Sequence, residues 1–183
     1  MSPQTIRQKL RSWLQITHQF SSGDVFIDEL CIVGKKNRAD LVHANGQLCG
    51  FEVKSEFDTL KRWKDQRNAY FEIFDEVWLC CHRKHATRAL ADSDTKYGIL
   101  IIDDFGCIAV LRPARKNEKV SAFFLTELLW RENLDFLCRK YDLPVNRREK
   151  IAEARQRLVS GLPLNVIQKE VLMVLKERYT VLL

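Results

Sequence analysis

Residues 38–70, RADLVHANGQLCGFEVKSEFDTLKRWKDQRNAY, contain the hairpin that decides the fold of this chain. Asn45 and Gly46 form a strong turn signal. The runs on either side, 39–44 and 47–56, have the composition and alternation of strands. The sequence therefore predicts two antiparallel strands joined by a tight connection at the centre of the molecule.

The second strand of this hairpin carries two opposite charges on one face. Successive side chains of a strand point to opposite faces, so Glu52 and Lys54 project together while Phe51 and Val53 project together from the other side. The apolar pair is expected to pack toward the core. The charged pair is therefore predicted to face a cleft.

The length of the turn decides whether Asp40, on the first strand, joins these charges. A two-residue turn places Asp40 opposite Phe51, and its carboxylate then lies on the face away from Glu52. A three-residue connection with Gly46 in the left-handed conformation places Asp40 directly across from Glu52. If the two carboxylates cooperate, the hairpin must have the longer, bulged connection.

Two carboxylates and an ammonium group at a strand pair suit metal-assisted hydrolysis of phosphodiesters. Carboxylate oxygens of Asp40 and Glu52 are the hard ligands that Mg²⁺ prefers. Lys54 is placed to orient or deprotonate the attacking water and to stabilise the added negative charge. Spacing alone leaves a plain alternative open, because a Glu-x-Lys pair is also common on exposed edge strands.

The arrangement Asp40, then Glu52-Val53-Lys54 within GFEVKSEFDTL, resembles the PD-(D/E)XK nuclease superfamily, and in particular a small single-domain bacterial and phage family within it. The resemblance is strong over about residues 25–80 and loose in the chain beyond. It implies a restriction-endonuclease-like fold, metal binding by Asp40 and Glu52, and a catalytic role for Lys54. DNA hydrolysis is the activity it implies.

The same resemblance suggests three further site residues. Glu29 matches an earlier acidic residue that contributes to the metal site, and it falls in an alternating apolar run where a carboxylate needs a partner. Gln66 and Tyr70 resemble the Q-x3-Y element of RecB-like nucleases, and their i,i+4 spacing puts them on one helix face, within reach of Lys54. Ala39 departs from the family's proline, which is not a ligand.

Basic and hydroxyl side chains around this motif are predicted to contact phosphates, which position a nucleic acid without reading its sequence. These candidate nucleic-acid-binding residues are Lys36, Arg38, Ser55, Arg62 and Arg67. On a larger scale, the basic segments 1–23, 112–119 and 139–157 flank acidic segments at 24–34 and 85–111. That pattern suits a protein that grips a polyanion, although solvated helix faces would look the same.

The rest of the chain predicts a mixed core followed by helices. Further strands are expected at 24–33, 77–81, 97–103 and 107–112, and helices at 5–20, 58–74 (capped by Asp58), 84–90, 122–141, 147–159 and 164–179. The predicted class is α/β (α+β): a mixed β-sheet flanked by helices, with a C-terminal helical extension. We expect a nuclease-like core at 1–115 and the extension at 121–183, separated in the basic loop 113–119.

Composition excludes several classes of protein. The chain has 183 residues, 46% of them hydrophobic and 30% charged, with a formal net charge of +6, which is typical of a globular domain. Ten Phe, four Trp and four Tyr argue against whole-chain disorder. The longest apolar runs are of strand length, so no membrane association is expected.

The six cysteines are expected to be buried, reduced thiols of a cytoplasmic protein, because no signal peptide is recognisable and most lie in predicted strands. Cys80, Cys81, His82 and His85 invite a zinc interpretation. Adjacent strand residues point to opposite faces, however, so Cys80 and Cys81 are poorly placed to share one tetrahedral ion. Asp103 and Asp104, before Phe105 and Gly106, most resemble turn residues.

These observations predict a Mg²⁺-dependent deoxyribonuclease, with Mn²⁺ as a substitute, acting in repair, phage or defence processes in the cytoplasm of a bacterial or phage-infected cell. DNA is the expected partner, with RNA left open, and the chain is expected to act as a homodimer or as a subunit of a larger complex. The alternative is a nucleic-acid-binding or partner-docking module with the same fold and no robust cleavage.

Overall fold

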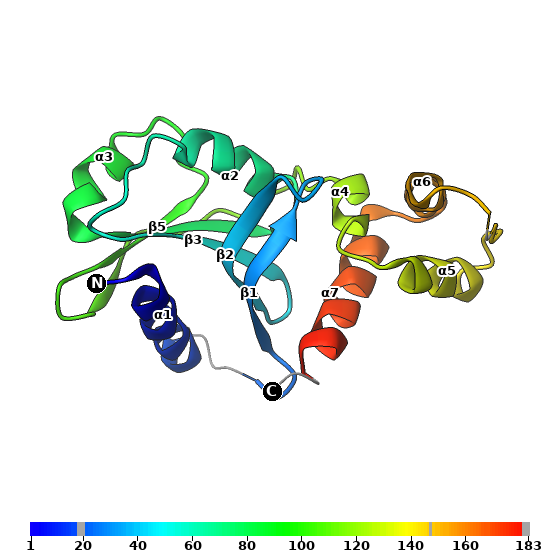
Figure 1. The fold of residues 1–183 in the computed structure, drawn as a ribbon, viewed down its shortest axis with the longest axis horizontal. Helices are drawn as coiled ribbons and strands as arrows, with labels where there is room; N and C mark the ends of the chain where they lie inside the picture. The colour runs from blue at the N-terminus through cyan, green and yellow to red at the C-terminus, as the bar shows by residue number, and fades with distance from the viewer. Residues whose placement is uncertain (18–20, 147, 181–183) are drawn as a thin grey trace.

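A six-stranded mixed β-sheet forms the centre of the computed structural model, which describes residues 1–17, 21–146 and 148–180 (Figure 1). The strands are β1 (Val25–Ile32), β2 (Asn37–Ala44), β3 (Leu48–Lys54), β4 (Glu76–His82), β5 (Gly98–Ile102) and β6 (Ile108–Arg112). They lie side by side in chain order. The neighbours β3, β4 and β5 run parallel, and the other adjacent pairs are antiparallel.

Helices cover both faces of this sheet. They are α1 (Pro3–Thr17), α2 (Trp63–Phe71), the 3₁₀ turn η1 (Arg83–His85), α3 (Ala86–Leu90), α4 (Ala122–Thr126), α5 (Arg131–Lys140), α6 (Ile151–Gly161) and α7 (Leu164–Thr180). The expected α+β class, a mixed sheet flanked by helices with a C-terminal helical extension, is confirmed. The end of the first predicted helix, residues 18–20, lies outside the described residues, as does residue 147 at the start of another. None of the helices described is long and apolar enough to cross a membrane.

The alternation of β3 separates two hydrophobic layers. Phe51 and Val53 pack beneath α1 together with Leu10. Glu52 and Lys54 point to the opposite face, which α2 covers, as the strand period requires. Gly50 lies on that α2 side because an added Cβ there would meet the ring of Phe74 at 2.2 Å.

The β2–β3 hairpin has the longer of the two predicted connections. Ala44 pairs with Leu48, leaving three residues between the strands, and the register places Asp40 across from Glu52. The prediction of a left-handed Gly46 is wrong, because Gly46 is absent from the positions with positive φ. Instead Asn45 closes the turn: its Oδ1 accepts the backbone N–H groups of Gly46 at 2.8 Å and of Gln47 at 3.2 Å.

Three predicted helices have clearly different bounds in the structure. The helix expected at 147–159 is α6, which begins at Ile151 and ends at Gly161. The helix expected from Asp58 begins only at Trp63, because the Asp58 carboxylate accepts the backbone N–H of Ser55 at 2.8 Å and stabilises a turn instead. The single helix expected at 122–141 is divided into α4 and α5. Trp130 is extended there, and its N–H donates to Asn133 Oδ1 at 3.0 Å, which starts a new helix.

The C-terminal helix α7 packs on the sheet beside β1 (Figure 1). Ile167 and Val171 are buried in the same hydrophobic cluster as Val25 of β1. Lys176 Nζ adds two polar contacts to this region, with Asp24 Oδ1 at 3.0 Å and with the backbone oxygen of Asn45 at 2.9 Å. The helical extension and the sheet therefore share one continuous apolar cluster.

The cysteines are free thiols. Burial is confirmed for Cys49, Cys80, Cys81 and Cys138, and it is wrong for Cys31 and Cys107, which are exposed.

Candidate functional site

A cavity of about 430 Å³ opens where the paired ends of β2 and β3 meet α2. Eight of the predicted site residues line it: Lys36, Arg38, Asp40, Glu52, Lys54, Arg62, Gln66 and Tyr70. The register of the hairpin brings the two carboxylates together, and α2 supplies Gln66 and Tyr70 from one helix face.

Glu52 is the most heavily bonded member of the site. Its side chain is 2% exposed, and its Oε1 accepts from Lys54 Nζ at 2.5 Å and from Gln66 Nε2 at 2.7 Å. The Tyr70 hydroxyl donates to Oε2 at 2.6 Å. Gln66 also accepts from Lys54 Nζ at 3.1 Å, so the three side chains hold one another in place.

Asp40 carries a strongly perturbed carboxyl group. Burial, followed by the nearby charge of Glu52, raises its pKa from 3.8 to about 6, because the Val53 hydrogen bond and Lys54 offset these effects only in part. Oδ2 accepts the backbone N–H of Val53 at 2.8 Å, which fixes the side chain toward β3. Paired carboxylates with an excess of negative charge fit a divalent cation, since hard oxygen ligands and local negative charge are what Mg²⁺ needs.

Tyr70 connects the two carboxylate positions. Its phenol is fully buried, donates to Glu52, and accepts the backbone N–H of Asp40 at 3.3 Å. Burial, followed by the negative charge of Glu52, raises the phenol pKa well above 10. Tyr70 is therefore a neutral hydrogen-bond donor at any pH at which the protein is expected to work.

Glu29 lies opposite Asp40 in the β1–β2 register, but it is not among the residues that line the cavity. Its carboxylate forms ion pairs with Arg7 of α1 and Arg38 of β2. Its backbone is left-handed, with φ of 56°, which interrupts an otherwise regular strand. Metal binding by Glu29 would require its carboxylate to turn from these two guanidinium groups toward Asp40.

Two predicted phosphate-binding residues are engaged elsewhere. Ser55 is 2% exposed and bonds to Asp58. Arg67 is buried and forms ion pairs with Asp92 and, at 3.5 Å, with Asp94. The structure thus leaves Lys36, Arg38 and Arg62 as the predicted basic side chains at the cavity.

The sequence did not point to two further carboxylates that line the cavity, Asp58 and Asp65. Asp65 directly precedes Gln66 in the first turn of α2, and that proximity was the available signal. Asp58 was interpreted only as a helix cap. Its place in a turn beside Lys54 depends on where α2 begins, which local sequence did not indicate correctly.

The fold and this cavity define a class: an α+β protein whose central hairpin presents two carboxylates and a lysine beneath one helix. The chain belongs to the bacteriophage P4 protein cII family, whose model matches residues 2–181. It is similar to "Protein cII" of Enterobacteria phage P4, with 26% identity over 179 residues that cover 96% of this chain and 67% of that protein.

Among solved structures, the chain is similar to the SPO1766 protein of unknown function from Silicibacter pomeroyi. The two are 17% identical with a TM-score of 0.47, and the match covers 81% of this chain and 99% of the other.

Proposed function

We propose that this protein is a Mg²⁺-dependent nuclease that hydrolyses DNA phosphodiester bonds. The observation that carries the proposal is the arrangement of Asp40, Glu52 and Lys54 in one cavity, with the Lys54 amino group 2.5 Å from Glu52. The resemblance of this motif to PD-(D/E)XK nucleases supports the same activity. The basic side chains of Lys36, Arg38 and Arg62 at the cavity suit a phosphate backbone.

Asp40 and Glu52 would hold the metal, and Glu29 is the proposed third carboxylate. Bound Mg²⁺ would acidify the attacking water and neutralise charge that develops on the phosphoryl oxygens. Mn²⁺ suits the same oxygen donors. The raised pKa of Asp40 is consistent with this assignment, because it reflects burial first and then the negative charge of Glu52, which Lys54 offsets only in part.

Lys54 would serve the reaction through its ammonium group. In the structure this group donates to Glu52 and to Gln66, which hold it at the cavity rather than in solvent. From this position it can orient a water molecule and stabilise the extra charge of the pentacovalent phosphorus. Gln66 and Tyr70 are positioning residues, since each contacts Glu52 directly.

A second candidate function is nucleic-acid or partner binding without robust cleavage. Its support is that both carboxylate oxygens of Glu52 already accept hydrogen bonds from protein side chains. A ligand at Glu52 must displace at least one of these donors. Large apolar side chains on the extension, Trp130 and Phe136, are 59% and 58% exposed, which would suit a docking surface for a protein partner.

The proposed setting is the cytoplasm of a phage-infected bacterial cell. The support is the family relationship to a protein of Enterobacteria phage P4. Action as a homodimer remains part of the proposal, because one site cuts one strand and coordinated duplex cleavage requires two. The alternative is a subunit of a larger repair, phage or defence complex.

A cleavage assay tests this function. Labelled single-stranded, duplex, flap and four-way-junction DNA, with RNA alongside, is incubated with the protein and Mg²⁺ or Mn²⁺. We expect cutting that EDTA, Lys54→Ala and Glu52→Gln each eliminate. Lys61→Ala is the matched control, because Lys61 is exposed in the same segment and is not among the residues lining the cavity.

The outcome separates the two functions. Cleavage that survives both Lys54→Ala and Glu52→Gln would reject the assigned site. Mobility shifts without cutting on any substrate would instead favour the binding module.

A further inference from the structure

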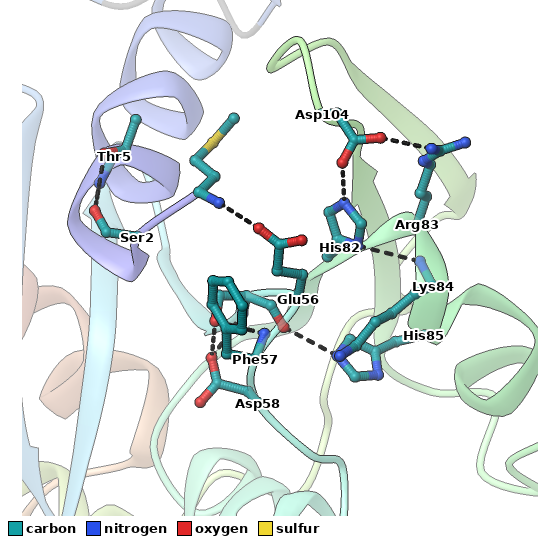
Figure 2. A network of polar contacts seen from close by, with 12 residues as sticks. Ser2, Thr5, Glu56, Phe57, Asp58, His82, Arg83, Lys84, His85 and Asp104 are labelled. Carbon is teal, nitrogen blue, oxygen red and sulfur yellow. Dashed lines mark hydrogen bonds and ion pairs between the residues drawn. The ribbon is translucent and has the colours of Figure 1, made fainter.

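Three metal-ligating side chains meet at the carboxyl ends of the parallel strands, beside the cavity. Glu56 lies two residues beyond β3, His82 is the last residue of β4, and Asp104 lies two residues beyond β5. Because β3, β4 and β5 are parallel neighbours, their carboxyl ends share one edge of the sheet. One ligand atom from each side chain lies within 4.8 Å of the others (Figure 2).

His82 presents one particular nitrogen to this cluster. The residue is 6% exposed, and its Nε2 lies 2.9 Å from Asp104 Oδ1. Its Nδ1 accepts the backbone N–H of Lys84 at 3.4 Å, a long hydrogen bond. Metal binding at Nε2 would place the imidazole proton on Nδ1, so the metal would replace both the hydrogen bond to Asp104 and this long contact.

In each carboxylate, one oxygen contacts a positively charged group. The second oxygen faces the other members of the cluster. Arg83 Nη2 contacts Asp104 Oδ2 at 2.5 Å, while Oδ1 faces His82. The Met1 ammonium contacts Glu56 Oε1 at 2.7 Å, and the other oxygen points toward His82 in Figure 2. The hydrogen bonds of His82 and then Arg83 lower the pKa of Asp104, and the hydrogen bond of the Met1 ammonium lowers the pKa of Glu56.

We propose that Glu56, His82 and Asp104 form a binding site for a divalent transition metal of the Zn²⁺ type, separate from the Mg²⁺ site proposed at Asp40 and Glu52. One imidazole and two carboxylates form a donor set suited to Zn²⁺, whereas Mg²⁺ prefers oxygen ligands alone. Ligand atoms around a zinc ion lie about 3–4 Å apart, so small side-chain rotations close the site.

The side chains can make that adjustment. Asp104 is 46% exposed and Glu56 is 34% exposed, and both lie beyond the ends of their strands. His82 is fixed by the end of β4 and would serve as the anchor. The thiols of Cys81 and Cys80 are buried in the two hydrophobic clusters and are not part of this group of ligand atoms.

A metal here would join the ends of three strands. One of its ligands, Glu56, is only two residues beyond Lys54 in the chain. Glu56, His82 and Asp104 come from segments that are far apart in the chain, so a shared ion would stabilise the native state over the unfolded one. It would also restrain the turn that follows β3 and carries Ser55 and Asp58. The inference does not depend on the proposed cleavage activity.

Calorimetric titration with ZnCl₂ tests the site. The protein carries Cys31→Ser and Cys107→Ser, which remove the exposed thiols as ligands. We expect one Zn²⁺ per chain, with affinity lowered at least about tenfold by Asp104→Asn and by His82→Gln. The thermal midpoint should rise with Zn²⁺, and Asp104→Asn should abolish that rise.

Two controls make the result specific. Asp103→Asn changes the adjacent carboxylate, which accepts backbone N–H groups of Phe105 and Cys107 and is outside the cluster. Asp40→Asn removes a ligand of the other site. Both are expected to retain Zn²⁺ binding. The proposal would be overturned by absence of Zn²⁺ binding, by binding that Asp104→Asn leaves unchanged, or by binding that is lost only with Asp40→Asn. If circular dichroism shows that His82→Gln does not fold, the result for Asp104→Asn decides, because Asp104 is exposed.

Discussion

The hydroxyl of Tyr70, on α2, donates a 2.6 Å hydrogen bond to Oε2 of Glu52, on β3. Both side chains are buried, and the bond links the covering helix to the strand that carries Lys54. A hydrogen bond to a charged group contributes about 1.5–3 kcal/mol when its partner would otherwise be left buried. Tyr70 is therefore important both for stability and for the direction in which Glu52 points.

Tyr70→Phe separates these two effects. We expect the free energy of unfolding to fall by about 1.5–3 kcal/mol, and single-turnover cleavage at saturating DNA to fall about 10–100-fold. Affinity for DNA, measured by mobility shift in Ca²⁺, should change little. Tyr97→Phe is the matched control, because this buried phenol donates to the Ala89 backbone oxygen at 3.1 Å, away from the cavity. Equal losses of cleavage in both variants would contradict a positioning role for Tyr70.

Asp40→Asn is expected to stabilise the protein in a pH-dependent way. The pKa of Asp40 is raised from 3.8 to about 6, so the folded protein keeps this proton after the unfolded chain has lost it. Ionised Asp40 thus lowers stability progressively as pH rises from about 4 to 6, by at most about 3 kcal/mol above that range.

Urea unfolding measures this difference at several pH values. The stability gained by Asp40→Asn should be close to zero near pH 4 and largest at pH 7–8, while cleavage is lost. A gain that does not depend on pH, or a loss of stability at pH 8, would contradict the ionisation of a buried, destabilised carboxyl group.

Lys36 and Arg62 are expected to determine part of the salt dependence of DNA binding. Each phosphate contact contributes about one unit to the slope of log affinity against log salt concentration. The double variant Lys36→Ala/Arg62→Ala should therefore reduce the magnitude of that slope by about two. Lys169→Ala, at a different cavity beside α7, serves as the control. An unchanged slope in the double variant would place the phosphate path elsewhere.

Gly50→Ala tests the close approach of β3 and the residues that follow α2. A Cβ at Gly50 would lie 2.2 Å from the Phe74 ring, so this ring or the strand must shift. We expect a loss of about 1–3 kcal/mol in unfolding free energy. Gly46→Ala is the control, because an added Cβ there meets nothing within 4 Å, and its effect should stay within about 0.5 kcal/mol. Similar losses in both variants would contradict this packing.

Local sequence was sufficient to predict which side chains of β3 share a face of the central sheet. The period of two placed Glu52 and Lys54 on one face, and the demand that Asp40 face Glu52 predicted a three-residue connection, which the pairing of Ala44 with Leu48 confirms. The conformation predicted for that connection, with Gly46 left-handed, was wrong, because Asn45 closes the turn through its own side chain. Turn length and turn geometry are separate properties, and the condition that Asp40 face Glu52 constrained only the first.

Contacts between distant segments could not be obtained from the sequence. Arg67 was expected at a phosphate, yet its guanidinium binds Asp92, which is 25 positions away in the chain. In the same way, His82 was considered only with its sequence neighbours, while its carboxylate partners follow two other strands. The periodicity of a strand or helix assigns a side chain to one face of that element. It does not indicate which distant loop contacts that side chain in the folded protein.

The contact of Lys176 with Asp24 and Asn45 bears on the order in which this protein folds during its synthesis. Helix α7 packs on the hairpin that supplies Asp40 and buries Leu175 in its core, so a nascent chain that has not yet emerged past α7 leaves that side of the sheet open to water. We therefore expect the hairpin that supplies Asp40 to reach its final packing only after α7 has left the ribosome.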